Sequence, residues 1–185
     1  MKEEEKILVT GGTGFVGSYL LRYLVAQGYT QIRALRRPGS RMDLVTPVAG
    51  QIEWVEGDVL DIFSLDDALE GVSQVYHCAA VVSFDSRETG RMMEVNVEGT
   101  ANLINAALSA GIKKFIHASS IATLGRTRER ETLDENRVWQ RGRFNTQYAI
   151  SKFLSEQEVW RGMAEGLEVG IVNPSVIIGS GRWDE

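Results

Sequence analysis

The chain has 185 residues, of which 43% are hydrophobic and 24% are charged, so it holds enough apolar side chains for one globular domain and too many for a disordered chain. It has no apolar run of the ~18 residues that a membrane span needs. The acidic start MKEEEK is unlike a secretory signal, and the net charge of −5 argues against a nucleic-acid-binding domain. Its single cysteine, Cys78, cannot form an internal disulfide, which predicts a reducing compartment, the cytoplasm.

Short apolar runs alternate with amphipathic segments along the chain. The apolar runs predict buried strands at residues 6–10, 31–36, 52–56, 74–79, 113–118 and 168–173. The amphipathic spacing predicts helices over about residues 14–27, 64–70, 87–110 and 146–165. Ser64 has the position of an N-cap for the second helix. Because alternating strands and helices need crossover connections, the sequence predicts an α/β fold: a doubly wound parallel sheet, or Rossmann fold, in three α/β/α layers.

A glycine-rich turn separates the first strand from the first helix. The segment Thr10–Gly17, TGGTGFVG, fits G-x-G-x-x-G from Gly12 and G-x-x-G-x-x-G from Gly11. In such a turn one glycine permits the tight bend, another lets the backbone approach a pyrophosphate, and a third, here Gly17, lets the helix pack closely on the strand. Helix N–H groups would face the phosphates, so the turn predicts dinucleotide binding. The alternative is a turn whose glycines serve packing alone.

Two arginines close the second predicted strand. Arg36 and Arg37 stand where a carboxylate that binds the ribose would indicate NAD. Cations instead suit the 2′-phosphate, so NADP is the expected cofactor and NAD is the alternative. Asp43 lies too far along the chain to be the usual ribose carboxylate. The alternative reading of the two arginines is that they face solvent.

Tyr148 and Lys152 lie one turn apart on the last predicted helix. An isolated phenol has a pKa near ~10 and is a poor acid at neutral pH, but a neighbouring ammonium lowers that pKa. Such a phenol can exchange a proton with a substrate oxygen while hydride moves to or from a nicotinamide. Ser119 and Ser120 close the fifth strand, where a hydroxyl can stabilise charge on a substrate carbonyl. Either serine could instead cap a turn.

Other polar segments favour ordinary structural roles. His77 and Cys78 lie near the end of the fourth predicted strand, without a second histidine at metal-ligand spacing. Both are interpreted as packed strand residues, and no metal site is expected. The charge-rich segment 125–143 predicts a solvated surface loop. An active-site loop that faces an anionic substrate is the alternative.

Taken together, these segments resemble the extended short-chain dehydrogenase/reductase family, within the NAD-dependent epimerase/dehydratase superfamily. The resemblance rests on TGGTGFVG at 10–17, GDV at 57–59, HCAA at 77–80, NVEGT at 96–100, SS at 119–120, YAISK at 148–152 and NPSVIIGSG at 173–181. The paired arginines, SSIATLG and YAISKFLSEQEV are most similar to the dihydroflavonol-4-reductase-like branch.

The resemblance implies roles for individual residues. Tyr148 would be the acid–base residue, Lys152 would bind the nicotinamide ribose and tune Tyr148, and Ser120 would be the catalytic hydroxyl, with Ser119 as the alternative. Adenine would lie between Asp58 and Val59, the cofactor's ribose and phosphates near Ala79 and Ala80, and the nicotinamide beside Pro174–Val176, while Asn96 would support the site. The expected cofactor contacts are Gly11, Thr13, Gly14, Phe15, Val16, Arg36, Arg37, Asp58, Val59, Ala79, Ala80, Asn96, Tyr148, Lys152, Pro174 and Val176.

The activity implied by the resemblance is reduction of a carbonyl on a small organic substrate by an NADP-dependent oxidoreductase. Dehydration is disfavoured, because Ile121 and Ala122 follow Ser120 where sugar dehydratases of the family carry an Asp-Glu pair. A nucleotide-sugar epimerase with bound NAD is the alternative, and related steroid dehydrogenases share a Tyr-x-x-Ser-Lys segment. A non-catalytic NAD(P)-binding or redox-sensing module is the alternative of another class.

The resemblance also bears on domain organisation. Family members continue past the segment matching NPSVIIGSG and build most of a substrate lobe there, whereas this chain ends at Glu185. We therefore expect residues 1–185 to be an NAD(P)-binding Rossmann domain from which the substrate lobe is largely absent. The two long predicted helices, 87–110 and 146–165, are expected to pair across a homodimer.

Overall fold

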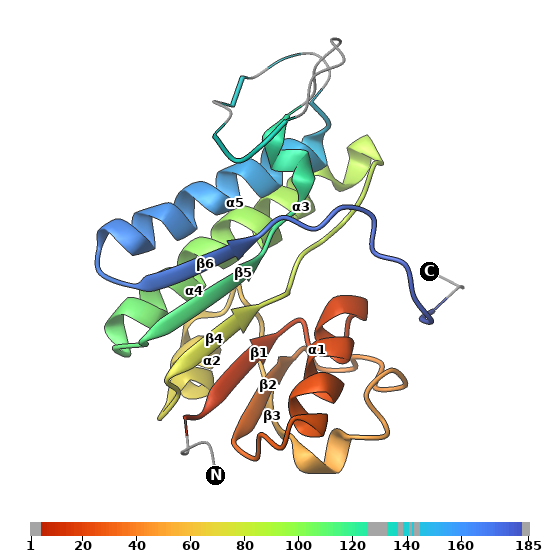
Figure 1. Ribbon diagram of the computed structural model, residues 1–185, viewed down its shortest axis with the longest axis vertical. Coiled ribbons are helices and arrows are strands. Elements are labelled where there is room, and N and C mark those ends of the chain that lie inside the picture. The colour runs from red at the N-terminus through yellow and green to blue at the C-terminus, as the bar shows by residue number, and fades with distance from the viewer. Residues whose placement is uncertain (1–4, 126–132, 137–138, 141, 143–144, 183–185) are drawn as a thin grey trace.

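A six-stranded parallel sheet forms the centre of the molecule (Figure 1). The structure is a computed structural model that describes residues 5–125, 133–136, 139–140, 142 and 145–182. The strand order is β3-β2-β1-β4-β5-β6. The strands are β1 (Ile7–Thr10), β2 (Ile32–Arg36), β3 (Glu53–Glu56), β4 (Gln74–His77), β5 (Lys114–Ala118) and β6 (Glu168–Val172). The order reverses between β1 and β4, which is the switch point where doubly wound sheets bind ligands.

Helices pack on both faces of this sheet, so the predicted doubly wound fold is confirmed. One core lies under α2, α4 and α5 and includes Leu103 and Phe115, and the other lies under α1 and includes Val9 and Leu21. The α-helices are α1 (Phe15–Ala26), α2 (Ile62–Leu69), α3 (Thr89–Met93), α4 (Gly99–Ser109) and α5 (Gln147–Ala164). The short helical turns are η1 (Ala49–Gln51), η2 (Ser86–Glu88), η3 (Glu94–Glu98) and η4 (Ile121–Leu124).

Two helix predictions change in detail. The predicted helix 87–110 is a succession of η2, α3, the π-helical turn η3 and α4. The predicted N-cap Ser64 is wrong, because α2 begins earlier and Asp61 caps it by accepting a hydrogen bond from Phe63 N. The Ser64 hydroxyl instead donates to the Asp61 carbonyl at 2.8 Å, as serines inside a helix do.

The structure tests the expectations about a membrane span and about segment 125–143 only within the described residues. Within the described residues, no helix has the length and apolar character to cross a membrane. Most of segment 125–143 falls outside the described residues, so both interpretations of it stay predictions.

Candidate functional site

A pocket of about 330 Å³ lies at the switch point of the sheet. We call it the switch-point pocket. It is bordered by the turn after β1, by the ends of β2 and β4, and by the segment after β3. The predicted cofactor residues that line it are Gly11, Thr13, Gly14, Arg36, Arg37, Asp58, Val59, Ala79 and Ala80. The fold thus brings the glycine turn against the segment after β4, with Thr10 and Ala79 in contact although they are 69 positions apart in the sequence.

The glycine turn makes contacts that no side chain would permit. Gly11 has a positive φ of 69°, and a Cβ on it would lie 2.6 Å from the Ala79 nitrogen. A Cβ on Gly17 would lie 2.2 Å from the Gly11 carbonyl oxygen. The N-cap of α1, Gly14, offers no side-chain acceptor to the first-turn N–H groups of the helix. These groups, which include those of Phe15 and Val16, are therefore suited to phosphate oxygens, and the cradle fits a dinucleotide.

The two arginines of the switch-point pocket differ in their surroundings. Arg36 donates a hydrogen bond to the Glu56 carboxylate at 2.6 Å, and the Arg36 Nε is buried without a partner among the described residues. Arg37 lines the same pocket beside Ser40. Glu56, at the end of β3, was not foreseen as a member of this site. It offsets part of the positive charge on which the NADP prediction rests.

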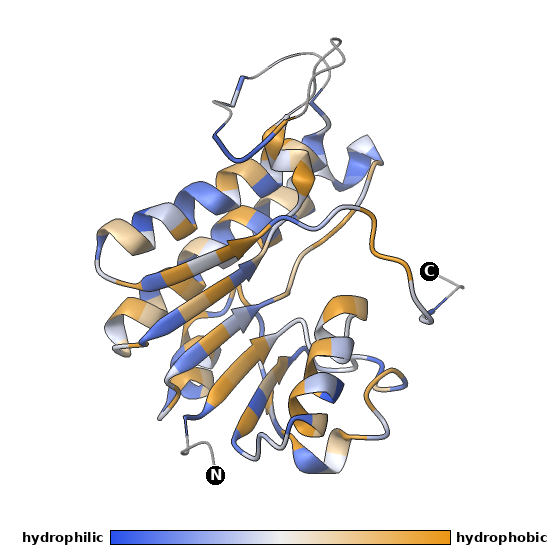
Figure 2. Cartoon of the chain, in the orientation of Figure 1, coloured by the Kyte–Doolittle hydropathy of each residue, from blue (hydrophilic) through white to orange (hydrophobic). Residues whose placement is uncertain are grey.

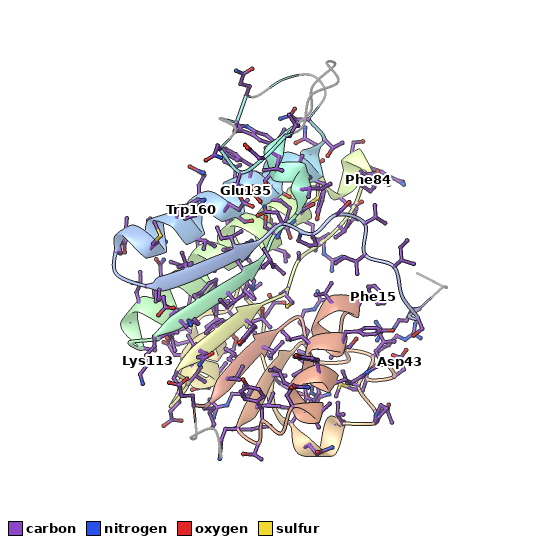
Figure 3. All side chains as sticks on the ribbon, in the orientation of Figure 1. Phe15, Asp43, Phe84, Lys113, Glu135 and Trp160 are labelled. Carbon is purple, nitrogen blue, oxygen red and sulfur yellow. The ribbon has the colours of Figure 1, made fainter. Side chains whose placement is uncertain are left out.

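A third arginine reaches this pocket from the end of the described chain. Arg182 lines the pocket and donates hydrogen bonds to both Asp43 carboxylate oxygens, the shortest of them 2.7 Å. These bonds lower the pKa of Asp43 to about 2. Figure 3 shows Asp43 and Phe15 beside the C-terminal segment, and Figure 2 colours part of that segment as hydrophobic. Arg182 thus engages the Asp43 carboxylate, and the expectation that Asp43 does not bind the ribose stays a prediction.

A second pocket, of about 540 Å³, contains the predicted catalytic hydroxyls Ser120 and Tyr148. We call it the Ser120–Tyr148 pocket. Ser120 caps η4, its Oγ accepting a hydrogen bond from Ala122 N at 3.2 Å, so the capping interpretation of this serine also holds. The Tyr148 ring packs edge-on against Phe84, with centroids 6.1 Å apart. Apolar side chains form most of the other walls of this pocket: Val82, Phe84, Ile121, Ala122, Ala149 and Val176.

Lys152 is not among the residues that line either of these pockets. It is 2% exposed, and its Nζ donates to the Ala118 carbonyl at 2.9 Å. Burial disfavours the ammonium and lowers the pKa of Lys152 to about 8. The side chain is nevertheless held at the carboxyl end of β5, the edge of the sheet where ligands bind in this fold.

A buried polar network joins the glycine turn to the helix that carries Tyr148. His77 bonds to Thr10 Oγ1 at 2.7 Å and to Thr100 Oγ1 at 3.0 Å, and Thr100 donates to the Asn96 carbonyl. Asn96 in turn bonds through its side chain to Ser151 on α5 at 3.0 Å. His77 is therefore a packed strand residue, as predicted, but one with a structural task. The sequence offered no signal for this network beyond polar residues at buried positions.

Asn96 acts at a distance from the pocket surface. It is 1% exposed and lies in the π-helical turn η3, which places its amide against the backbone of Val81. The amide oxygen accepts from Val81 N at 2.7 Å, and the amide nitrogen donates to Val81 O at 2.9 Å. Because Val81 lines the switch-point pocket, Asn96 supports that wall from behind.

The remaining predicted residues lie near the C-terminal segment. Phe15 lines a further pocket of about 320 Å³ together with Ile177 and Ile178. Val176 is 84% exposed, and the Pro174 carbonyl accepts a hydrogen bond from Ile121 N at 3.1 Å. In the part of the chain that the structure describes, no cluster of three or more histidine, cysteine or carboxylate side chains could hold a metal.

Comparison with known proteins agrees with this geometry. Residues 7–185 match the family described as "NAD dependent epimerase/dehydratase family". A putative dihydroflavonol 4-reductase from Synechocystis sp. is 38% identical over 176 residues, which cover 95% of this chain and 50% of that protein. The chain therefore spans about half the length of this relative.

Two solved structures are similar. The first is the crystal structure of gox2253, whose sequence is 39% identical and whose TM-score is 0.82. The match covers 92% of this chain and 51% of that one. A short-chain dehydrogenase/reductase superfamily protein from Agrobacterium tumefaciens, solved with bound NAD, is 32% identical with a TM-score of 0.75, and the match covers 91% of this chain and 48% of that one. The glycine cradle, the switch-point pocket and the family match together show that this chain belongs to the NAD-dependent epimerase/dehydratase family, whose members bind nicotinamide cofactors.

Proposed function

We propose that the protein is an NADP-dependent oxidoreductase that reduces the carbonyl of a small organic substrate with apolar or aromatic groups. The observation that carries this proposal is that Ser120 and Tyr148 share one apolar-walled pocket at the carboxyl edge of the sheet. The similarity to a putative dihydroflavonol 4-reductase supports a reductase. The apolar walls favour an apolar or aromatic carbonyl compound over a nucleotide sugar, since a sugar nucleotide presents mainly polar groups.

In this proposal each hydroxyl has a separate task. The bound dinucleotide would supply hydride to the carbonyl carbon. The Ala122 N–H holds Ser120 Oγ in place and leaves the serine hydroxyl hydrogen to donate to the carbonyl oxygen. Tyr148 would donate the proton that this oxygen takes up during reduction. Phe84 packs on the Tyr148 ring and limits the orientations available to the phenol.

NADP is proposed from the cations of the switch-point pocket. Arg36, Arg37 and Arg182 all line it, and arginine binds phosphate oxygens in a fork-like geometry. The carboxylates that line the pocket or touch its arginines, Asp58, Glu56 and Asp43, offset part of this charge. The preference for NADPH over NADH is therefore expected to be moderate.

The test is turnover of the purified protein with NADPH and a panel of aromatic and aliphatic aldehydes and ketones. Tyr148→Phe should lower kcat by about a hundredfold or more, because general acid catalysis contributes 10²–10⁴-fold. The NADPH Kd of the variant is measured as well, because Tyr148 is also an expected cofactor contact. Tyr23→Phe is the matched control, since it removes the same hydroxyl from a tyrosine 61% exposed on α1. Equal turnover of Tyr148→Phe and the parent protein would refute the catalytic assignment.

An epimerase with bound NAD is the second candidate, and the Arg36–Glu56 ion pair is the observation in its favour. Pairing with Glu56 weakens the attraction of Arg36 for a 2′-phosphate. NAD carries no 2′-phosphate, so this pairing does not weaken its binding. Incubation with nucleotide sugars, followed by chromatographic analysis of the products, separates the two activities. Tight binding of NADPH without turnover of either substrate class would instead identify a non-catalytic binding module.

We further propose a homodimer through α5 and the helical segment 87–110, which ends in α4. The exposed apolar side chains Trp160 and Met163 on α5 support it, being 45% and 48% exposed. Figure 3 labels Trp160 on this helix. Sedimentation of the parent protein and of Trp160→Glu should show a dimer for the first and a monomer for the second.

A further inference from the structure

A second buried imidazole, that of His117, lies against the ammonium of Lys152. His117 is on β5, is 1% exposed, and lies in register with His77 on the neighbouring strand β4. Its Nε2 is 3.3 Å from Lys152 Nζ and 3.3 Å from Ser155 Oγ. The site prediction had not singled out His117, because nothing in the sequence pairs β5 with α5.

The contact with Lys152 is the basis for placing the proton of His117 on one ring nitrogen. A lysine ammonium can only donate hydrogen bonds, so His117 Nε2 must accept from Lys152. The Ser155 hydroxyl donates to the Lys152 carbonyl at 2.9 Å, so its oxygen faces Nε2 with a lone pair and would suit the opposite tautomer, with the proton on Nε2. With the Lys152 ammonium as the donor, the His117 proton is assigned to Nδ1, which is buried without a partner among the described residues.

This arrangement is costly if His117 serves packing alone. A buried N–H without a partner destabilises the fold, and an apolar ring of similar size would avoid that penalty. The imidazole also cannot relieve it by taking a second proton, because burial and the Lys152 charge hold the pKa of His117 well below its ordinary value. What the imidazole supplies that a phenyl ring cannot is a neutral acceptor for Lys152.

The acceptor completes the hydrogen bonding of the ammonium inside the protein. Ala118 O accepts one of its three N–H groups and His117 Nε2 a second, which leaves one for an external partner. The other titratable groups that act on Lys152 are Glu156 on α5 and the Cys78 thiol after β4, which both favour the ammonium. His77 lies behind His117 with ring centroids 5.2 Å apart and is neutral, because burial lowers its pKa to about 3.

We propose that His117 is a positioning residue for Lys152: it accepts a hydrogen bond from the ammonium, which fixes Nζ at the end of β5 and leaves one N–H directed to the cofactor. The proposal rests on the proposed oxidoreductase function for its kinetic consequence. Loss of the acceptor removes a hydrogen bond that the charged ammonium makes more strongly than the neutral amine, so it shifts Lys152 toward the neutral amine. Binding of the cofactor and the alkaline limit of activity should then change together.

The test compares His117→Leu, which has no acceptor, with His117→Gln, whose amide oxygen can accept. His117→Leu should move the alkaline limb of the kcat/KM–pH profile down by about one pH unit and raise the cofactor Kd about tenfold, the range expected for a lost hydrogen bond to a charged group. His117→Gln should restore both quantities to within about twofold. Ser155→Ala is the control, because it removes the other polar neighbour of the imidazole and leaves the Lys152 contact in place.

A readout without turnover separates this proposal from the proposed function. The pKa of Lys152, about 8 in the parent protein, can be followed by NMR titration of its side chain. A lower pKa in His117→Leu but not in His117→Gln supports the positioning role even if no carbonyl substrate is reduced. An unchanged Lys152 pKa in His117→Leu, or equal effects of both variants, overturns it. Should His117→Leu not fold, His117→Phe makes the same comparison with a ring that lacks an acceptor.

Discussion

Replacement of Arg36 by alanine should weaken NADPH binding about tenfold and leave NADH binding within about twofold. The 2′-phosphate is the only group that distinguishes the two cofactors, and Arg36 is one of the cations that line the switch-point pocket. A hydrogen bond to a charged group contributes about 1.5–3 kcal/mol, which corresponds to roughly 10–150-fold in affinity. We expect the lower end of this affinity range for Arg36, because it already bonds to Glu56 at 2.6 Å and its side chain is 29% exposed.

The same ion pair predicts an effect in the opposite direction. Glu56→Gln removes a carboxylate that competes with the phosphate for Arg36 and repels it. NADPH affinity should therefore rise by about three- to tenfold, consistent with ~1 kcal/mol for charges near the surface, while NADH affinity stays constant. The gain should shrink as ionic strength rises, because salt screens exposed charges.

Calorimetric titration of each variant with NADPH and NADH measures these changes. Lys113→Ala is the matched control, since it removes one positive charge from a side chain that is 72% exposed before the amino end of β5. Figure 3 shows Lys113 across the molecule from Phe15 and Asp43. Equal weakening of both cofactors by Arg36→Ala would refute the reasoning, and so would stronger binding of NADH than of NADPH to the parent protein.

Further predictions concern stability and the C-terminal segment. Gly17→Ala should destabilise the fold by about 1–3 kcal/mol in urea unfolding and abolish cofactor binding, because the added methyl would lie 2.2 Å from a backbone oxygen. Gly50→Ala is the control and should be near neutral, because nothing lies within 4 Å of the Cβ that it adds. Burial lowers the pKa of His77 to about 3, so between about pH 6.5 and 3 the unfolded chain binds a proton that the folded chain does not. The contribution of His77 to stability should therefore fall with decreasing pH in that window, by at most about 1.4 kcal/mol per unit, and His77→Gln should remove this part of the slope. Asp43→Asn should speed amide exchange in residues 178–182 without changing global unfolding, because it weakens the bonds from Arg182.

The fold could be predicted because its signals are local. Each buried parallel strand is a short apolar run, and the glycine turn after β1 has a spacing that few other structures require. The predicted helix boundaries were less accurate where two neighbouring residues can both act as the N-cap. Asp61 and Ser64 can both cap a helix, and which of them does so depends on where the chain leaves β3.

The candidate site was predictable only where a residue is part of a spaced motif. Gly11, Tyr148 and Lys152 belong to such motifs. Glu56 and His117 do not, since their partners lie 20 and 35 positions away. Pairing across strands and between a strand and a helix depends on register, and no short-range pattern in the sequence records it.

The sequence by itself determined the alternation of strands and helices, the dinucleotide turn and the positions of Ser120, Tyr148 and Lys152. Only the tertiary structure decided that Arg36 is held by a carboxylate, that Lys152 is buried against a neutral imidazole, and that Ser120 and Tyr148 share an apolar pocket. The reason is physical: hydropathy and glycine spacing act over a few residues, whereas burial and ion pairing arise from segments that meet only when the chain folds.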